Sequence, residues 1–322
     1  MACTTFMLSK DGPTLVAKSY DWQHEDGIIH RNPAGLRKKG LLLSQSERPV
    51  EWVSRYASLS FNQYGREMPN GGMNDAGLVV EIMWLEGAGW PAPDDRPALN
   101  ELQWIQYQLD MYATTREVVE GANAIRVAPI HGEVHYMVCD PSGECASLEY
   151  LGGELVIHHG DSMPIPALTN STYARSAASV RSRPPDPKDM SSLGRFRRAA
   201  SITDRSSSLD LAWETLDSVQ WKRTQWQIVY DPENLQVYFR TRGNRAIRKI
   251  SLPAIPAVCG PEIWTFSMQE PVSGSVDSRF TTYDPERNHA LVRTGVAQLN
   301  SSLPQEVVHA VSSISQHFVC DN

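Results

Sequence analysis

Cys3 stands almost at the beginning of the chain, in the sequence Met1-Ala2-Cys3-Thr4-Thr5-Phe6. Removal of the first two residues would place a thiol and a free α-amino group on one residue. The thiolate is a nucleophile, and an α-amine with a pKa of about 7.7–8.0 exchanges a proton near neutral pH. A cysteine near a chain end is weak evidence by itself, because chain ends tolerate most residues. The residues that follow must therefore decide whether Cys3 is a catalytic nucleophile.

A hairpin is predicted to bring two charged residues beside Cys3. Residues 6–22 contain two apolar runs separated by Asp11-Gly12, which is typical of a tight turn. The end of the second strand returns beside the start of the first, which places Lys18 and Asp21 near Cys3. A cation near a thiol favours the thiolate, and a carboxylate orients an α-amine by accepting its hydrogen bond. Together the three residues predict an N-terminal cysteine nucleophile.

At these positions the sequence resembles the choloylglycine hydrolase family, which contains bile salt hydrolases and penicillin V acylases. The resembling segments run from Cys3 to about Leu252, and they comprise residues 3–6, 17–22, 72–78, 168–171, 194–196 and 224–240. The resemblance implies an N-terminal-nucleophile hydrolase of linear amides whose mature chain begins with the catalytic cysteine. Lys18 stands where the family usually has Arg, so the positive charge is kept and the planar two-pronged donor is lost.

The later segments supply candidates for stabilising the oxyanion that forms when an amide is attacked. Loss of one donor to such an oxyanion costs on the order of 3 kcal/mol. The resemblance implies that the side-chain amide of Asn170 is one donor and that Arg195 is an active-site arginine. The backbone N–H of Trp84, at the end of the predicted strand 77–84, is expected to be the second donor. Asn170 also begins a glycosylation sequon, an alternative that catalysis would exclude.

Aromatic residues near these positions are predicted to line an apolar acyl pocket. The candidates for substrate binding are Tyr20, Trp22, Phe61 and Asn74, with Trp84 and Trp90 as further aromatic candidates. Large aromatic residues are more often core, and an Asn beside two glycines is also ordinary turn chemistry.

The expected reaction is hydrolysis of a linear N-acyl amide through a covalent acyl-enzyme, without a cofactor or a metal. The Cys3 thiolate attacks the carbonyl, and its α-amine, oriented by Asp21, protonates the leaving nitrogen and then activates water. Lys18 and Arg195 would tune charge or bind polar groups of the substrate. Two alternatives stay open: an N-acyltransferase or cyclase that uses the same acyl-enzyme, and a non-catalytic binding protein on the same fold.

A papain-like Cys–His pair is the main enzymatic rival, although the local sequence expected around such a cysteine is missing. It would join Cys139, Cys145 or Cys259 to His131, His135, His158 or His159. Cys139 and Cys145 flank the Asp-Pro-Ser-Gly segment 140–143 of a predicted hairpin and are candidates for a disulfide. Cys259 and Cys320 are far apart in the sequence, which argues against a disulfide framework.

The elements that must position these residues form a mixed pattern, which predicts an α+β fold. Strands are expected at 4–9, 13–20, 77–84, 133–139, 144–150, 225–230 and 235–241, and helices at 102–112, after Thr114, after Gly194, at 209–219 and at 304–318. The resemblance implies a four-layer αββα sandwich of two antiparallel sheets. We expect residues 1–2 to be a leader removed by autocatalytic processing and residues 3–322 to form a single N-terminal-nucleophile hydrolase domain.

Composition is that of an ordinary enzyme, and the resemblance implies a small-molecule N-acyl amide substrate. The chain of 322 residues has a net charge of −7, which argues against a nucleic-acid partner, and its Arg-rich segment 175–205 is interpreted as a surface connection. The sequence contains no run of about eighteen apolar residues, so no membrane span is predicted. The first thirty residues also lack the apolar core of a signal peptide. As written the chain is expected to be cytoplasmic, or periplasmic or secreted if an export signal has been removed. A homo-oligomer, dimer or tetramer, is left open.

Overall fold

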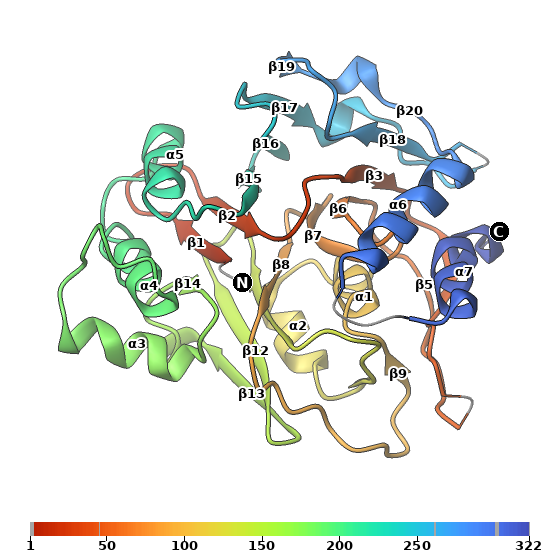
Figure 1. Ribbon diagram of the computed structural model, residues 1–322, viewed down its shortest axis with the longest axis horizontal. Coiled ribbons are helices and arrows are strands. Elements are labelled where there is room, and N and C mark those ends of the chain that lie inside the picture. Colours follow the sequence, from red (N-terminus) through yellow and green to blue (C-terminus); the bar gives the residue numbers. More distant parts are fainter. Residues whose placement is uncertain (1–2, 45, 261, 300–302, 322) are drawn as a thin grey trace.

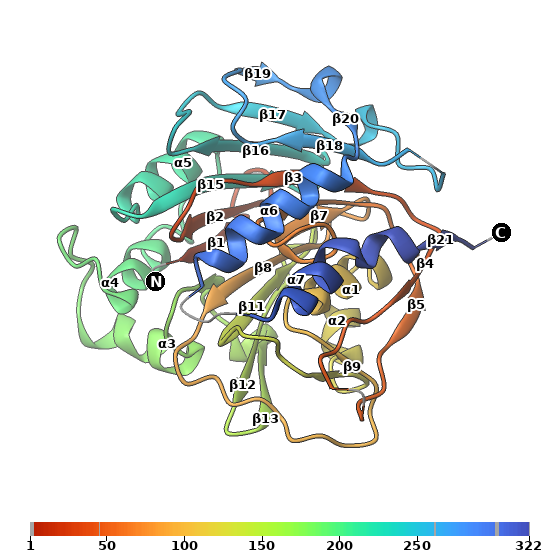
Figure 2. The same cartoon turned by 45° about the vertical axis from the view of Figure 1, so that its right-hand side comes forward.

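The computed structural model describes residues 3–44, 46–260, 262–299 and 303–321, so the predicted leader at residues 1–2 lies outside the described chain. Within these ranges two large, mainly antiparallel sheets pack against each other and helices cover their outer faces (Figures 1 and 2). This arrangement confirms the predicted α+β class and the αββα layering.

The first sheet carries the N-terminal hairpin in its interior. Its strands lie in the order β14 (Ala167–Leu168), β1 (Thr4–Leu8), β2 (Leu15–Asp21), β15 (Thr224–Asp231), β16 (Gln236–Thr241), β17 (Arg248–Ser251) and β19 (Gly274–Ser275). The hairpin β1–β2 is therefore flanked by two segments that come much later in the chain, β14 and β15.

The second sheet is longer and supplies the opposite wall of the core. Its strands lie in the order β13 (Glu154–His159), β12 (Cys145–Leu151), β11 (Val134–Cys139), β8 (Val79–Trp84), β7 (Pro69–Asn74), β6 (Ser58–Asn62), β3 (Ile28–Asn32), β18 (Trp264–Ser267) and β20 (Thr281–Thr282). Two small sheets lie outside it, formed by β21 (Val319–Cys320), β4 (Leu36–Lys39) and β5 (Glu51–Val53), and by β9 (Ala98–Leu99) and β10 (Arg126–Val127).

Helices cover each sheet from outside (Figure 1). On the second sheet lie α1 (Gln103–Met111) and α2 (Thr115–Gly121), and beside the first lie α3 (Tyr173–Ser182), α4 (Ser192–Ala200) and α5 (Leu209–Ser218). The C-terminal helices α6 (Pro285–Ala297) and α7 (Gln305–Ser313) pack against each other. The capping box predicted at Thr114 and Glu117 is present at the start of α2. The predicted helix 304–318 changes into a 3₁₀ helix at Ile314–His317.

Side chains of β8 show why this strand is buried on both faces. Val79 and Met83 belong to the core between the two sheets, whereas Val80 and Ile82 belong to the cluster beneath α1 and α2. Successive residues of a strand point to opposite faces, so a strand covered on both sides reads as a continuous apolar run. The predicted strand 77–84 has that pattern and matches β8.

Two disulfides are present, and one of them contradicts the expectation from the sequence. Cys139 pairs with Cys145, as considered above, and Cys259 pairs with Cys320 across 61 residues of sequence. The second pair was missed because tertiary structure alone returns β21 beside the segment that contains Cys259. Cys3 is the remaining cysteine and has a free thiol. The papain-like alternative loses all three of its candidate thiols.

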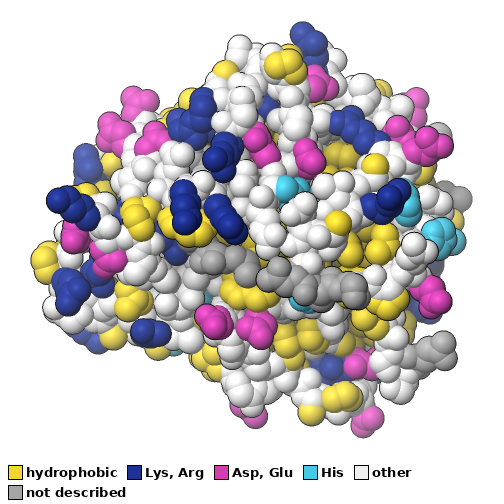
Figure 3. All heavy atoms as spheres, in the orientation of Figure 1, with side chains coloured by type: hydrophobic (Ala, Val, Ile, Leu, Met, Phe, Trp, Pro, Cys, Tyr) yellow, Lys and Arg dark blue, Asp and Glu magenta, His cyan; other side chains and the backbone are white. Residues whose placement is uncertain are grey.

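The Arg-rich segment contributes both surface and core. On the face in Figure 3, Lys and Arg side chains gather mainly over the region of α3–α5, with acidic side chains among them. Three arginines of α4 are nevertheless buried, Arg195, Arg197 and Arg198. The sequence predicted that this segment would be a surface connection. No helix within the described residues is long and apolar enough to cross a membrane.

Candidate active site

The N-terminal hairpin places Cys3 beside Asp21, as its sequence predicted. β1 and β2 pair with Thr4 opposite Ser19, so Cys3 precedes the first pair and Asp21 follows it. The Cys3 Sγ lies 3.9 Å from the backbone carbonyl oxygen of Asp21. Cys3 is only 3 % exposed, and burial raises the pKa of its thiol.

Asp21 is a buried carboxylate with one oxygen satisfied and one not. Its Oδ1 accepts hydrogen bonds from Ser19 Oγ, at 3.1 Å, and from Thr224 Oγ1. Its Oδ2 has no hydrogen-bond partner among the described residues. Burial raises the pKa of Asp21 to about 6, against the hydrogen bonds from Thr224 and Ser19 that lower it. The site thus contains an acceptor that lacks a donor.

Lys18 lies on the other side of the hairpin in a buried ion pair. Its Nζ is 3.2 Å from Glu81 Oε2 on β8 and donates to the backbone carbonyl of Ile82. Glu81 also accepts a 2.6 Å hydrogen bond from Tyr230 Oη. Burial is the main cause that raises the pKa of the Cys3 thiol, and the charge of Lys18 is the largest influence that lowers it. Lys18 therefore favours the thiolate from within the core.

Arg195 links Cys3 to Asn170. Its Nη1 donates to the carbonyl oxygen of Cys3, at 2.5 Å, and to Thr4 Oγ1, at 2.6 Å. Its Nη2 donates to Asn170 Oδ1 at 2.9 Å. Residues 192 positions apart in sequence thereby meet at the head of β1. The guanidinium fixes the side-chain amide of Asn170 with its nitrogen directed away from Arg195.

The amide nitrogen of Asn170 meets Trp84 through a group different from the one expected. Asn170 Nδ2 donates a 2.8 Å hydrogen bond to the carbonyl oxygen of Trp84. The sequence predicted that the N–H of Trp84 and this amide would act together as donors. In the structure the two residues are adjacent, and the Trp84 carbonyl occupies the amide donor.

An apolar pocket opens beside Cys3. It is lined by residues in or beside β2, β8, β11 and the start of α1, in the loops around 64–70 and 130–132, and in the C-terminal helices and their connection: Tyr20, Trp22, Tyr64, Met68, Ile82, Trp84, Leu102, Ile130, Val134, Val296, Leu299, Leu303 and Val311. Asn70, Asn100, Glu101 and His131 add polar groups to the lining. The predicted substrate-binding residues Tyr20 and Trp22 are both in this wall.

Two other predicted substrate-binding residues lie outside that wall. Phe61 packs edge-on against Tyr230 and Phe239 in the core between the sheets. Asn74 is fully buried, and its side chain accepts from the N–H groups of Ala76 and Leu78. Asn74 is thus engaged in the turn between β7 and β8, which is the alternative that its Gly-rich context favoured.

Comparison with known proteins gives a consistent picture. No family model matches the chain. The chain is 28% identical over 191 residues to penicillin V acylase from Pectobacterium atrosepticum, and the match covers 53% of this chain and 50% of that protein. This similarity supports the resemblance to the choloylglycine hydrolase family that the sequence predicted. The chain spans about half the length of the curated relative that it matches.

Solved structures show the same fold over most of this homologue. Penicillin V acylase from Agrobacterium tumefaciens superposes with a TM-score of 0.75 at 21% identity, covering 88% of this chain and 98% of that structure. A variant of conjugated bile acid hydrolase from Clostridium perfringens gives a TM-score of 0.70 at 20% identity, covering 84% and 98%. The predicted fold is confirmed.

Positioning residues of this homologue were missed by sequence reasoning. Glu101 is buried, and its carboxylate accepts hydrogen bonds from the N–H groups of Ile130, His131 and Gly132 at 2.7–3.0 Å. It therefore holds the loop that forms one rim of the pocket. A lone Glu before a helix gives no signal of this role, because its partners lie some thirty residues away.

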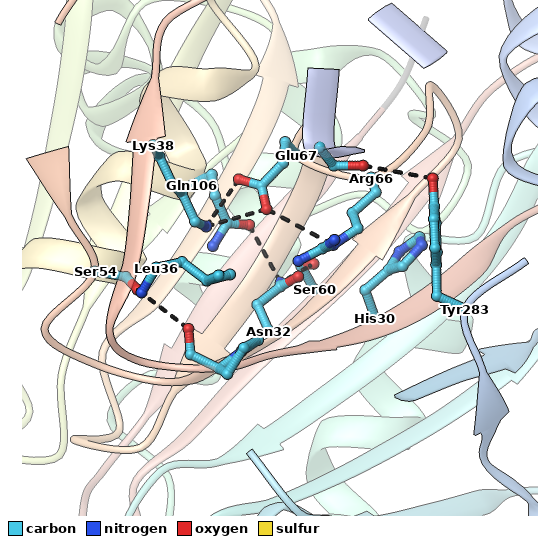
Figure 4. Close-up of polar contacts among 12 residues, drawn as sticks. His30, Asn32, Leu36, Lys38, Ser54, Ser60, Arg66, Glu67, Gln106 and Tyr283 are labelled. Atoms are coloured by element: carbon cyan, nitrogen blue, oxygen red, sulfur yellow. Dashed lines mark hydrogen bonds and ion pairs between the residues drawn. The ribbon is translucent and has the colours of Figure 1, made fainter. Parts of the chain in front are cut away.

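A buried polar network supports the opposite pocket wall. Lys38 and Arg66 approach the Glu67 carboxylate from two sides (Figure 4), and Lys38 Nζ lies 2.8 Å from Glu67 Oε2 and 2.9 Å from Asp110 Oδ2. Glu67 has a φ of +72°, a backbone conformation that residues other than glycine rarely adopt. The network holds this strained turn, whose neighbours Tyr64 and Met68 line the pocket.

Within the described chain, no group of three or more His, Cys, Asp or Glu residues could hold a metal ion.

Replacing Lys18 by Met is expected to slow the reaction of Cys3 with iodoacetamide at pH 7 by several-fold to about tenfold. The thiol pKa rises when the lowering charge is removed, and one pKa unit changes the thiolate fraction about tenfold. Burial already raises the pKa of Glu81, so this carboxyl can take up a proton when Lys18 is lost. The measurement is the alkylation rate against pH, with Lys10→Met on the exposed end of the same hairpin as the control. Identical profiles for Lys18→Met and the wild type would contradict the assignment.

Proposed function

We propose that the protein hydrolyses linear N-acyl amides, with Cys3 as an N-terminal nucleophile after removal of residues 1–2. The observation that carries this proposal is that Oδ2 of Asp21 has no partner among the described residues, in a residue whose backbone carbonyl contacts the Cys3 thiol and in a chain similar to penicillin V acylase. A buried carboxylate oxygen without a donor is costly. An α-ammonium group on Cys3 would supply both a donor and an opposite charge, which makes the processed chain chemically complete.

In the proposed reaction the Cys3 thiolate adds to the amide carbonyl carbon, and the carbonyl oxygen becomes an oxyanion. Asn170 donates to this oxyanion through Nδ2 in exchange for its hydrogen bond to the Trp84 carbonyl. The α-ammonium transfers a proton to the leaving nitrogen, the C–N bond breaks, and an amine departs from the thioester. The α-amine then removes a proton from water, which attacks the thioester and releases the acid and the thiol.

Arg195 supports this chemistry by position and by charge. It holds the Cys3 carbonyl and the Asn170 side chain at the same time. Its double contact fixes the distance between the nucleophile and the proposed oxyanion donor, which is the form of preorganisation that lowers an acyl-transfer barrier. Asp21 in turn would hold the α-amine, and Lys18 would favour the thiolate.

The pocket supports an apolar acyl group. Aromatic and aliphatic side chains form most of its wall, and the C-terminal helices contribute Val296 and Val311, with Leu299 from the connection after α6. Such a wall excludes water from an acyl chain and offers few partners to a charged one. The acyl part of the substrate is therefore proposed to be aromatic or aliphatic, with the polar amine part towards the opening.

The test is an assay of purified protein against penicillin V, N-acyl amino acids and N-acyl homoserine lactones. Expected results are release of amine and acid, a mature N-terminus at Cys3 by mass spectrometry, and a transient mass increase equal to one acyl group. An active protein that retains Met1 would refute the mechanism. Product made with an added amine in place of water would indicate an acyltransferase, and binding without turnover, equal in Cys3→Ala, would indicate a binding protein.

Replacing Leu299 by Trp is expected to shorten the accepted acyl chain. The indole fills space beside the apolar wall, so kcat/KM for a dodecanoyl substrate should fall by about tenfold or more relative to a butanoyl substrate. Rates with the two N-acyl homoserine lactones measure this ratio. Ala297→Trp, at the exposed last residue of α6 and two positions before Leu299, is the matched control. An unchanged chain-length ratio in Leu299→Trp would show that the acyl group binds elsewhere.

The two disulfides favour an oxidising compartment for the mature protein, since cytosolic proteins rarely keep structural disulfides. Cys139–Cys145 and Cys259–Cys320 account for four of the five cysteines. Thiol titration of the denatured, unreduced protein should therefore give one thiol per chain, and a value of five would argue for a reducing compartment. The proposed unit is one hydrolase domain over residues 3–322.

A further inference from the structure

We infer that His135 and Glu149 form a buried positioning pair that fixes the peptide bond before Asn170, and thereby the oxyanion donor. This inference rests on the proposed function. Both side chains are fully buried, and neither touches the pocket beside Cys3. Their effect on the reaction would therefore pass through the backbone of residues 169–173, which contains the Thr169–Asn170 peptide.

The pair lies on neighbouring strands and reaches the site through two hydrogen bonds. His135 Nδ1 is 2.8 Å from Glu149 Oε1, and His135 Nε2 is 2.7 Å from the carbonyl oxygen of Thr169. The other side of the same peptide is held as well, because the N–H of Asn170 donates to Ser192 Oγ at 3.0 Å. The peptide plane is thus held at its C=O and at its N–H.

Glu149 extends the same support to the next turn of chain. Its carboxylate accepts the backbone N–H of Tyr173, at 2.9 Å to Oε1 and 3.1 Å to Oε2, where α3 begins. Residues 169–173 are therefore attached to the second sheet at both ends, by His135 and by Glu149. Asn170 lies inside this clamped segment.

The hydrogen-bonding pattern requires both imidazole nitrogens to face acceptors. A carbonyl oxygen only accepts, so Nε2 carries a proton. A second proton lies between Nδ1 and Glu149 Oε1, because two lone pairs would repel each other at 2.8 Å. The two atoms therefore share a hydrogen bond whichever of them carries this proton. The ring is consequently fixed in one orientation by two strong contacts, which makes His135 a rigid donor towards Thr169.

The Cys139–Cys145 disulfide fixes the register that brings the pair together. β11 and β12 pair with Cys139 opposite Cys145 and Tyr136 opposite Leu148, so His135 falls opposite Glu149. A shift by one residue would turn the two side chains to different faces of the sheet. The disulfide at the closed end of this hairpin therefore contributes to the orientation of Asn170 from the far side of the strand.

The test compares three variants by steady-state kinetics with the best substrate of the panel. The double variant His135→Leu/Glu149→Leu removes the clamp without leaving one charge buried and unpaired, and kcat should fall on the order of 100-fold with KM within about threefold. His135→Gln can still donate to Thr169, and its kcat should stay within about fivefold of the wild type. The control is His159→Leu/Glu144→Leu, which removes the other His–Glu pair of this sheet, 3.3 Å apart and partly exposed; its kcat should not change.

A second readout does not depend on activity. The side-chain amide of Asn170, assigned in ¹⁵N–¹H spectra with Asn170→Asp, should shift in the clamp double variant and stay in place in His135→Gln and in the control. Unchanged kcat, or an unchanged amide resonance in the clamp double variant, would overturn the inference. A wild type without amidase activity would refute the proposed function, and the amide resonance would still decide whether the pair positions Asn170.

Discussion

Replacing Cys3 by Ala should lower the rate of amide hydrolysis by at least about 10⁴-fold, because no other group at the site can form the acyl-enzyme. The other four cysteines are in disulfides, and the described residues provide no second thiol near Asp21. The change removes one sulfur from a buried position, so the fold should persist. Initial rates with the best substrate and intact-protein mass after substrate addition measure the two consequences.

The matched control for this variant is the double change Cys259→Ser/Cys320→Ser. It removes two sulfur atoms far from Asp21 and leaves the Cys3 thiol in place, so acylation should still be observed. Acylation of the Cys3→Ala protein, or a rate within tenfold of the wild type, would show that another group is the nucleophile.

Asp21→Asn should abolish most activity and at the same time stabilise the chain that retains residues 1–2. An amide cannot hold a charged α-ammonium as a carboxylate does, and loss of this acid–base support should lower kcat by about 10²–10⁴-fold. In that longer chain Cys3 has no α-ammonium, and Oδ2 of the buried carboxylate has no partner among the described residues. Replacing the Asp21 carboxylate by a neutral amide should therefore raise the free energy of unfolding of this chain at pH values where Asp21 is ionised.

The pH dependence of this gain follows from the raised pKa. Asp21 titrates near 6 in the folded chain and near 3.8 when exposed. Its protonated form adds stability that is fully present below about pH 4 and is lost as the pH rises through 6. At pH 7.5 the chain that retains residues 1–2 should thus be less stable than its Asp21→Asn variant by about 3 kcal/mol, a difference of roughly two pKa units, and the two should converge below pH 4.

Urea unfolding of the two proteins between pH 3.5 and 8 measures the difference, with Asp11→Asn at the exposed hairpin turn as the control. Asp11 has a φ of 48°, a conformation that Asn tolerates well. If the chain that retains residues 1–2 and its Asp21→Asn variant were equally stable at every pH, Asp21 would be paired or hydrated in solution.

Local pattern predicted the part of the site that one hairpin contains. The turn at Asp11-Gly12 and the two apolar runs around it define the register, and register alone brings Cys3 to Asp21. The same reasoning was available for His135 and Glu149. Two strands closed by Cys139 and Cys145 place these residues opposite each other, yet the histidine was considered without its cross-strand neighbour.

Sequence pattern failed where a side chain had two plausible environments. Phe61 and Asn74 were expected in the pocket, and the structure packs one in the core and uses the other in a turn. Burial alone does not distinguish a pocket wall from a core, since both are apolar and close to strands. Lys18 shows the reverse case, because its buried partner Glu81 looks like an ordinary strand residue in the sequence.

The sequence by itself determined that Cys3 lies beside Asp21, and it determined the class of fold, because these depend on a short hairpin and on the alternation of apolar residues. Only the tertiary structure decided that Arg195 joins Cys3 to Asn170, that Cys259 meets Cys320, and that the C-terminal helices close the pocket. The contact between Arg195 and Cys3 spans 192 residues of sequence, and the contact between Cys259 and Cys320 spans 61. Such contacts depend on how the two sheets pack together, and no local periodicity records that packing.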